Sequence, residues 1–273
     1  MTHITDLALA RRLERCEGRA NTEFVAARAR LEPASGAASA VTDDAFAMFD
    51  GIGSPITQTF GLGLDSAPDD ATLTALEAFF ESRGADVSHE TTPLADAGLP
   101  AALQARGYRV IEYSSVLHAP MESLVVHAAP GDITVRPIGV GEVERWSDTS
   151  AAGWGETPEL AEFIRGYGRI GAQAVGSTAF IAEQDGVAMG TGALGMHDGV
   201  ALLAGASTPP AFRRRGVQAA LLAARIAYAR AAGCDLVMMA AAPGSTSQCN
   251  AERRGLRVAY TRVKWQRQLS HRG

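Results

Sequence analysis

The chain has 273 residues, of which 47% are hydrophobic and 20% are charged. This length exceeds the usual domain size of roughly 100 to 150 residues, so the sequence favours two domains over one. The formal net charge of −5 argues against sequence-independent nucleic-acid binding, which depends on clustered cations that neutralise phosphates. Lys264 is the only lysine, which excludes a phosphate-binding Walker lysine and disfavours Schiff-base chemistry.

Cysteine usage and the amino terminus bear on the compartment. Cys16, Cys234 and Cys249 are far apart and lack the spacing of zinc ligands, which fits a reducing environment. Charged residues such as Asp6 and Glu14 interrupt any apolar stretch at the amino terminus, so we expect no signal peptide. No window reaches the ~18 uninterrupted apolar residues of a membrane span. We therefore expect a cytoplasmic protein with neither membrane nor nucleic acid as a partner.

The first 120 residues show alternating helix and strand patterns. Apolar spacing predicts a long amphipathic helix over residues 7–31, which ends before Pro33. A second helix is expected over 69–84, because Asp69 and Asp70 suit its first turn. The other expected elements are strands at 45–49, 56–64, 85–90 and 108–118 and a helix at 95–106.

The pattern loosens around residues 119–132, which include Pro120, Pro130 and Gly131. We predict a linker there, so that the domains are 1–120 and 133–273 with 121–132 between them. The second domain is expected to hold strands at 133–137, 178–183, 188–194, 200–207, 236–241 and 257–266, helices at 143–154, 158–172 and 248–254, and a long helix after the arginines at 213–215. These elements predict an α/β fold with a mixed sheet.

Both halves end in the same succession of strand, helix, strand, short helix with a closing glycine, and long strand. Segment 102–110 parallels segment 250–258, which indicates an internal duplication with a period of about 150 residues. The alternative is that any helix ending in glycine before a strand gives such a parallel.

Segment 207–222 reads as a strand that turns into a helix. The first amides of a helix have no internal partners and lie at the positive end of its dipole, so this junction is a natural phosphate receptor. Gly216 lets a ligand approach the backbone closely, and the arginines at 213–215 add positive charge. The apolar face of the following helix and Gly233, at the position of its closing cap, support this interpretation. The alternative is that residues 213–215 form a solvated loop before an ordinary helix.

Two other motifs carry less weight. Gly190, Gly192 and Gly195 fit the GxGxxG pattern, but a dinucleotide fingerprint must open a helix, and residues 196–199 turn instead into another strand. The six histidines show no spacing typical of metal ligands, so we expect no metal site.

Segment 210–221, with the sequence PAFRRRGVQAAL, resembles the acetyl-CoA signature of the GNAT superfamily of N-acetyltransferases, (Gln/Arg)-x-x-Gly-x-(Gly/Ala). Arg213 and Gly216 are in place. Gln218 departs from the signature, because it replaces the small residue and would either crowd the phosphate or reach it with its own amide.

A second segment, 245–256, resembles the short helix with Asn that precedes Gly-Phe in these enzymes. Asn250 is present, and Leu256 stands in place of the Phe. The resemblance covers about residues 133–268 and extends by the duplication to a tandem GNAT protein with a degenerate amino-terminal half.

The resemblance implies two GNAT-like domains, each a twisted, mostly antiparallel sheet flanked by helices. It also implies that the strand at 202–208 separates from its neighbour and holds the pantetheine arm, with its N–H groups on the thioester carbonyl. Such amides would stabilise the oxyanion formed when an amine attacks. The residues expected to bind acetyl-CoA are Ala206, Ser207, Thr208, Arg213, Arg214, Arg215, Gly216, Val217, Gln218, Ala219 and Asn250.

The sequence points less clearly to catalytic residues. Many GNAT enzymes carry a Tyr four residues before the closing glycine, and this chain has Ala251 there. Tyr260 is the nearest phenol in sequence, although a core-packing role is the stronger alternative. Ser247 and Asn250 are candidates for binding the arm or holding a water, but serine at a helix start is often a cap.

Trp154 and Glu156 lie between the first two helices of the second domain, where GNAT proteins usually shape acceptor specificity. An aromatic ring beside a carboxylate suits a cationic amine. The alternative is a helix-start Glu with a packing Trp. The amino-terminal half is acidic at 65–70, where phosphate would be repelled, so we expect it to complete the acceptor cleft or brace the catalytic half.

The sequence thus predicts an acyltransferase that moves an acetyl group from acetyl-CoA to a primary amine of a small molecule, peptide or protein, without a metal. A homodimer is a candidate assembly. The competing hypothesis is a non-catalytic acyl-CoA-binding or interaction protein. Ala251 favours it, as does the lack of acidic residues in 200–207.

Overall fold

The protein is described from a computed structural model that covers residues 5–42, 45–124, 132–154 and 157–269. The chain divides into two compact units, residues 1–118 with 240–273 and residues 119–239. The carboxy-terminal segment therefore groups with the amino-terminal part of the chain. The predicted domain bounds at 120 and 133 stay a prediction, and residues 125–131 of the predicted linker lie outside the described ranges.

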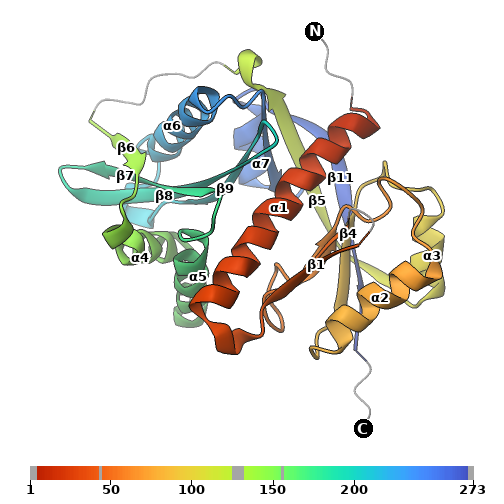
Figure 1. The fold of residues 1–273 in the computed structure, drawn as a ribbon. Helices are drawn as coiled ribbons and strands as arrows, with labels where there is room; N and C mark the ends of the chain where they lie inside the picture. The colour runs from red at the N-terminus through yellow and green to blue at the C-terminus, as the bar shows by residue number, and fades with distance from the viewer. Residues whose placement is uncertain (1–4, 43–44, 125–131, 155–156, 270–273) are drawn as a thin grey trace. The chain divides into compact units, whose positions relative to one another are not determined.

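The first unit is built on strands in the order β1-β2-β3-β4-β11-β5. Its elements are α1 (Leu7–Leu31), β1 (Ala38–Thr42), β2 (Ala45–Phe49), β3 (Gln58–Phe60), α2 (Asp70–Glu81), β4 (Val87–Thr91), α3 (Leu99–Ala105), β5 (Arg109–Pro120), α7 (Thr246–Glu252) and β11 (Arg257–Arg267). β11 lies between β4 and β5 and pairs antiparallel with both. The last strand of the chain thus completes a sheet that begins near the amino terminus (Figure 1).

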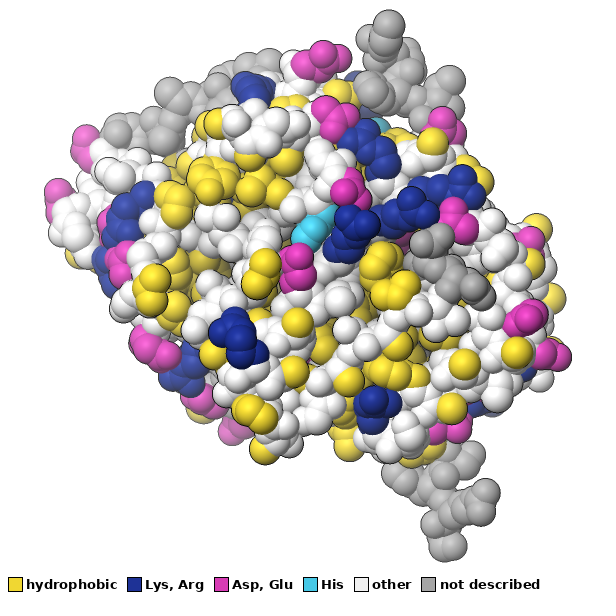
Figure 2. Space-filling view, viewed as in Figure 1, with side chains coloured by type: hydrophobic (Ala, Val, Ile, Leu, Met, Phe, Trp, Pro, Cys, Tyr) yellow, Lys and Arg dark blue, Asp and Glu magenta, His cyan; other side chains and the backbone are white. Residues whose placement is uncertain are grey.

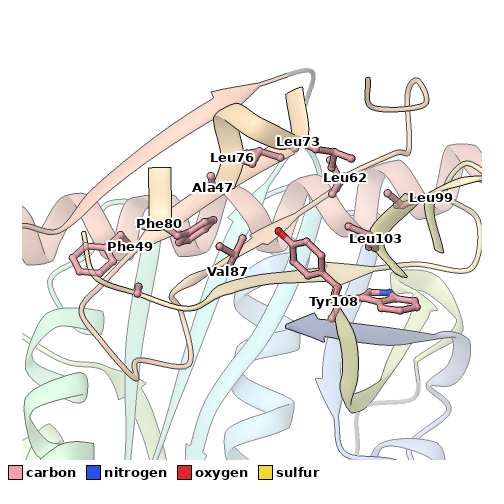
Figure 3. Packing of buried hydrophobic residues seen from close by; sticks show 13 residues of the cluster. Ala47, Phe49, Leu62, Leu73, Leu76, Phe80, Val87, Leu99, Leu103 and Tyr108 are labelled. Atoms are coloured by element: carbon pink, nitrogen blue, oxygen red, sulfur yellow. The ribbon is translucent and has the colours of Figure 1, made fainter. Parts of the chain in front are cut away.

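Apolar side chains of α2 and α3 pack with side chains of the sheet strands in a buried cluster of the first unit (Figure 3). Leu73, Leu76 and Phe80 recur at helical spacing on α2 and pack in one cluster with Leu103 of α3. Asp69 caps α2, because its carboxylate accepts a main-chain hydrogen bond at 2.7 Å. The predicted second helix is therefore confirmed.

The second unit contains strands in the order β10-β9-β8-β7-β6. Its elements are β6 (Thr134–Pro137), α4 (Val143–Trp154), α5 (Pro158–Gly171), β7 (Ser177–Gln184), β8 (Val187–His197), β9 (Val200–Ser207), α6 (Val217–Ala231) and β10 (Leu236–Ala241). The pairs β6–β7, β7–β8 and β8–β9 are antiparallel, and β10 runs parallel to β9. Helix α6 lies on one side of this sheet, with α4 and α5 on the other (Figure 1).

The α/β fold class predicted from the sequence is confirmed, and the predicted elements of the second half end within three residues of the observed bounds. Two expectations for the first half were wrong. Strand β1 was missed, because it is an edge strand of small residues with an alternation of exposed and half-buried positions. The strand predicted at 56–64 is reduced to β3, because Gly61 and Gly63 adopt positive φ angles of 81° and 80° and turn the chain.

Candidate functional site

The turn between β9 and α6 presents a row of free main-chain amides. A short 3-10 turn (Pro210–Phe212) precedes it, and the chain then passes through Arg214 and Gly216 at φ angles of 62° and 83°. The N–H groups of residues 214–219 have no acceptor among the described residues; the next amide, of Ala220, donates to Gly216 O at 3.0 Å. Amides gathered at the positive end of a helix form an anion-binding site.

The three arginines of this turn differ in their surroundings. The guanidinium of Arg213 donates to Gly153 O at 3.0 Å and Thr208 O at 3.3 Å, which ties the turn to the end of α4. Arg215 donates to the side chain of Gln184 at 3.0 Å. Arg214 is exposed and has no ion-pair or hydrogen-bond partner within the described part of the chain. Arg214 is therefore the cation most available to an incoming anion.

Gln218, the departure from the family signature, folds back over the turn. Its Nε2 donates to Thr208 Oγ1 at 2.6 Å, which links the first turn of α6 to the end of β9. Val217 is buried and packs below the sheet, where a Cβ on Gly190 would come within 2.6 Å of its Cγ1. Gly190 belongs to β8, so the GxGxxG match lies within a strand, as expected. The missing side chain of Gly190 lets α6 pack closely against β8.

Strand β9 separates from β10 after three residue pairs. The parallel pairing runs only from Val200 to Leu202. A register shift against β8 follows, and Gly205 adopts a φ angle of 58°. Ala206 is exposed, whereas Ser207 is buried and its Oγ donates to Ser150 O at 2.7 Å. The separation agrees with the arrangement that the GNAT resemblance implies for this strand.

The end of α4 is packed tightly against the end of β9. A Cβ on Gly153 would overlap Ser207 Oγ and come within 2.9 Å of Thr208 N. This close approach and the Arg213 hydrogen bond place the start of the predicted acceptor loop beside the amide row. Trp154 is 52% exposed there. Glu156, the other predicted acceptor-binding residue, lies outside the described residues.

Ser247 and Asn250 lie on α7 in the first unit, both exposed. Asn250 Oδ1 accepts a hydrogen bond from Arg253 at 3.2 Å. The cap of α7 is Ser245, whose Oγ accepts from Gln248 N, so Ser247 is not the capping residue. Ala251 is buried, and its position offers no polar group. The roles of Ser247 and Asn250 toward acetyl-CoA stay predictions.

Tyr260 is buried and belongs to a polar cluster with Arg262 and with Glu14 of α1. Its hydroxyl donates to Glu14 Oε1 at 2.7 Å, and Arg262 donates to the same oxygen at 2.7 Å. Burial is the largest of the effects that raise the pKa of Tyr260 well above its ordinary value. A buried phenol that already donates to a carboxylate is a poor proton shuttle, which favours the packing alternative for Tyr260.

One charged residue of the second unit was missed by the sequence analysis. Arg225 lies on the buried side of α6 and is 3% exposed. It follows Leu221 by four residues and Val217 by eight, so its place on the apolar face was visible in the helical spacing. That spacing was the available signal, because an arginine on such a face needs buried partners.

None of the described helices combines the length and apolar character needed to cross a membrane. Within the described residues, no three His, Cys, Asp or Glu side chains are grouped so that they could hold a metal ion. On the face shown in Figure 2, basic and acidic side chains are interspersed.

The structure is that of an α/β protein in which a row of main-chain amides precedes helix α6. Residues 142–254 match the sequence model described as "Acetyltransferase (GNAT) family". This part of the chain therefore belongs to the GNAT family, and the protein contains an acyltransferase domain. A search of curated protein sequences gave no match.

Three solved structures are similar to the chain over most of its length. A GCN5-related N-acetyltransferase from Kribbella flavida has a TM-score of 0.63 and 20% identity, covering 91% of this chain and 96% of that one. A tandem GNAT protein from the clavulanic acid biosynthesis pathway has a TM-score of 0.60 and 14% identity, with coverages of 82% and 78%. A functionally unknown protein from Staphylococcus epidermidis has a TM-score of 0.57 and 11% identity, with coverages of 79% and 86%. These likenesses show a shared fold.

Proposed function

We propose that this protein transfers an acetyl group from acetyl-CoA to a primary amine by direct attack. The observation that carries the proposal is the row of amides at residues 214–219, which have no acceptor among the described residues and lie at the positive end of a helix, where a pyrophosphate would be favoured. Arg214 adds a cation that has no partner among the described residues, and Gln218 and Thr208, which are hydrogen-bonded to each other at 2.6 Å beside this turn, are further polar candidates for the same ligand.

The separated part of β9 is the proposed site of the acyl end. Beyond Leu202 the strand has no pairing with β10 among the described residues, so its main-chain groups can pair with the extended pantetheine arm. N–H groups of residues 204–206 would then hold the thioester carbonyl. When the amine attacks, the same donors stabilise the oxyanion, which is usually the largest catalytic contribution.

Proton transfer is proposed to use water, with Ser247 and Asn250 as candidates to hold it. Trp154 offers an exposed aromatic face for the acceptor beside the tied end of α4, and Glu156 is the proposed partner of its ammonium group. A cytoplasmic location and a homodimer are predicted with this function.

The second candidate function is a non-catalytic acyl-CoA-binding protein. Ala251 is buried at the position where many GNAT enzymes have their Tyr, and Tyr260 is engaged with Glu14. These observations leave no obvious general acid among the described residues to protonate the departing thiolate. Steady thiol release from acetyl-CoA with any member of an amine panel supports transfer, and tight CoA binding without turnover on the whole panel supports the second function.

The CoA site itself is tested with a matched pair of glycine variants at the two ends of α6. Gly216 and Gly233 both have a φ angle of 83°, so Gly216→Asp and Gly233→Asp add the same side chain in the same strained conformation. Gly216→Asp places a negative charge in the amide row and should weaken CoA binding by at least tenfold, since a charge-assisted hydrogen bond contributes about 1.5 to 3 kcal/mol. Gly233→Asp should leave CoA affinity within about twofold. Equal CoA affinity in the two folded variants would refute the proposed site.

A further inference from the structure

Arg225 of α6 makes all its described hydrogen bonds to main-chain carbonyl groups. Its Nε donates to Leu221 O at 3.2 Å, within the same helix. One terminal nitrogen, Nη1, donates to Ala193 O at 3.0 Å and to Ala204 O at 3.1 Å. A single nitrogen therefore joins β8 to β9 at the register shift between them.

The protein keeps this guanidinium charged in a buried place without a carboxylate beside it in the described structure. Burial lowers the pKa of Arg225 to about 10, so the group still carries its charge at neutral pH. Burying an unpaired charge is costly, and a nearby Asp or Glu would relieve that cost. Gly192 makes room for the group, because a Cβ there would come within 2.9 Å of Arg225 Cζ.

The position of the two carbonyls fixes the direction of a particular amide. Because Nη1 contacts both oxygens, the Ala193 and Ala204 carbonyls converge between β8 and β9. A trans peptide unit is planar, with its C=O and N–H pointing in opposite directions. The Gly205 N–H shares a peptide unit with the Ala204 carbonyl, so it points away from β8. That side of β9 is the one from which β10 has separated.

We propose that Arg225 is a positioning residue for the acyl group, which it serves by holding the Ala204–Gly205 peptide so that the Gly205 N–H donates to the thioester carbonyl. This inference rests on the proposed function and adds to it a residue that acts through the backbone. The guanidinium also polarises the Ala204 carbonyl, which makes the N–H of the same peptide a stronger donor. The buried charge thus acts on the place where negative charge develops during transfer.

The face of β9 that lies away from Arg225 packs against Trp146, and this packing does not orient the Gly205 N–H. Gly205 faces Trp146 of α4, whose Cη2 would lie 3.8 Å from an added Cβ, and Trp146 is held by a hydrogen bond to Phe180 O at 2.8 Å. Packing against Trp146 limits the space around the strand, but it supplies no donor to the Ala204 carbonyl. Arg225 is therefore the side chain that orients this peptide.

The test compares Arg225→Met with Arg230→Met. Arg230 lies on the same helix and also donates to main-chain carbonyls, those of Met121 and Leu124, so its loss removes a comparable interaction elsewhere. Binding of CoA and of acetyl-CoA is measured by calorimetry. The bound thioester is observed by infrared difference spectroscopy with acetyl-CoA that carries 13C at the carbonyl. A hydrogen bond to this carbonyl lowers its stretching frequency.

In the wild type and in Arg230→Met, the bound carbonyl band should lie at lower frequency than in water. In Arg225→Met the band should return toward its value in water, and the affinity for acetyl-CoA should fall by roughly two- to tenfold, the range of one neutral hydrogen bond. The affinity for CoA, which has no acyl carbonyl, should not change. Arg225→Lys should restore part of the band shift, because it keeps the charge without the planar geometry.

An unchanged band in Arg225→Met with acetyl-CoA bound would overturn the positioning role while leaving the proposed function intact. Failure of wild-type protein to bind CoA or acetyl-CoA would instead overturn the proposed function. Should circular dichroism show that Arg225→Met is unfolded, the same criterion applies to Arg225→Lys and to Gly192→Ala, which displaces the guanidinium without removing it.

Discussion

Glu90 of β4 gives the chain a pH dependence of stability that can be measured without knowledge of any ligand. Its carboxyl lies 3.5 Å from Arg262 Nη1 within the cluster that also contains Glu14 and Glu17. Burial raises the pKa of Glu90 from 4.5 to about 7; Arg262 and Lys264 lower it, and the two neighbouring carboxylates raise it further. The folded protein therefore holds a proton on Glu90 at pH values where the unfolded chain has released it.

The sign of the effect follows from this difference in proton binding. Between about pH 4.5 and 7 the folded state binds more protons at Glu90 than the unfolded state, so its contribution to the free energy of unfolding falls as pH rises. Each unit of difference between the pKa values of the folded and unfolded states is equivalent to about 1.4 kcal/mol, so the total loss of unfolding free energy is on the order of 3 kcal/mol. Glu90→Gln keeps the shape of the protonated side chain and should remove this loss.

The assay is urea unfolding of wild type and Glu90→Gln from pH 5 to 8. The variant should gain stability relative to wild type as pH rises, and Glu122→Gln, at an exposed carboxyl, should not. Burial lowers the pKa of His89 to about 3, which adds an opposite slope below pH 6.5, but subtraction of the two proteins cancels it. A difference between wild type and Glu90→Gln that stays flat over this range would refute the reasoning.

Two further predictions concern packing and catalysis in the same protein. Gly153→Ala should destabilise the fold by about 1 to 3 kcal/mol and raise the KM for the acceptor, because the new methyl group overlaps Ser207. Gly166→Ala is the control, since its position on α5 has open space around it and the change should not destabilise the fold. Equal stability of the two variants would contradict the close packing. Tyr260→Phe should lower the free energy of unfolding by about 1 to 3 kcal/mol, because it removes the hydrogen bond to Glu14. Tyr260→Phe, Ser247→Ala and Asn250→Ala should each reduce turnover by less than ~100-fold. A larger loss of turnover in any of them with CoA affinity intact would reveal a dedicated catalytic group.

Elements with strong local signals could be predicted from the sequence. The turn before α6 could be predicted because Gly216 and its neighbouring arginines precede an apolar helix, and Gly233 at the end of that helix has the left-handed conformation expected of a cap. Helix α1 and strand β9 have the predicted bounds. These features depend on neighbours along the chain, which is where sequence patterns carry information.

Long-range pairings could not be predicted in the same way. The place of β11 between β4 and β5 joins residues about 170 positions apart, such as Val263 and Thr91, and no local pattern encodes that choice. The partners of buried charges are equally non-local, since Arg262 meets Glu14 and Glu90 only after the sheet and α1 have packed together. The hydrogen bonds of Arg225 to two carbonyls belong to the same category.

The two buried arginines, compared with each other, indicate which one has a role beyond folding. Arg262 forms ion pairs with Glu14 and Glu17 at 2.7 Å and lies 3.5 Å from Glu90, so its charge has carboxyl partners inside the first unit. Arg225 is as deeply buried, yet its described partners are carbonyl dipoles, and its positive field extends to the register shift of β9. If stability alone had shaped this position, an apolar side chain would fill the space below Gly192 at lower desolvation cost. A permanent positive charge beside the register shift of β9 instead favours negative charge on the side of β9 that faces away from β8, where a thioester oxygen would lie during attack by an amine.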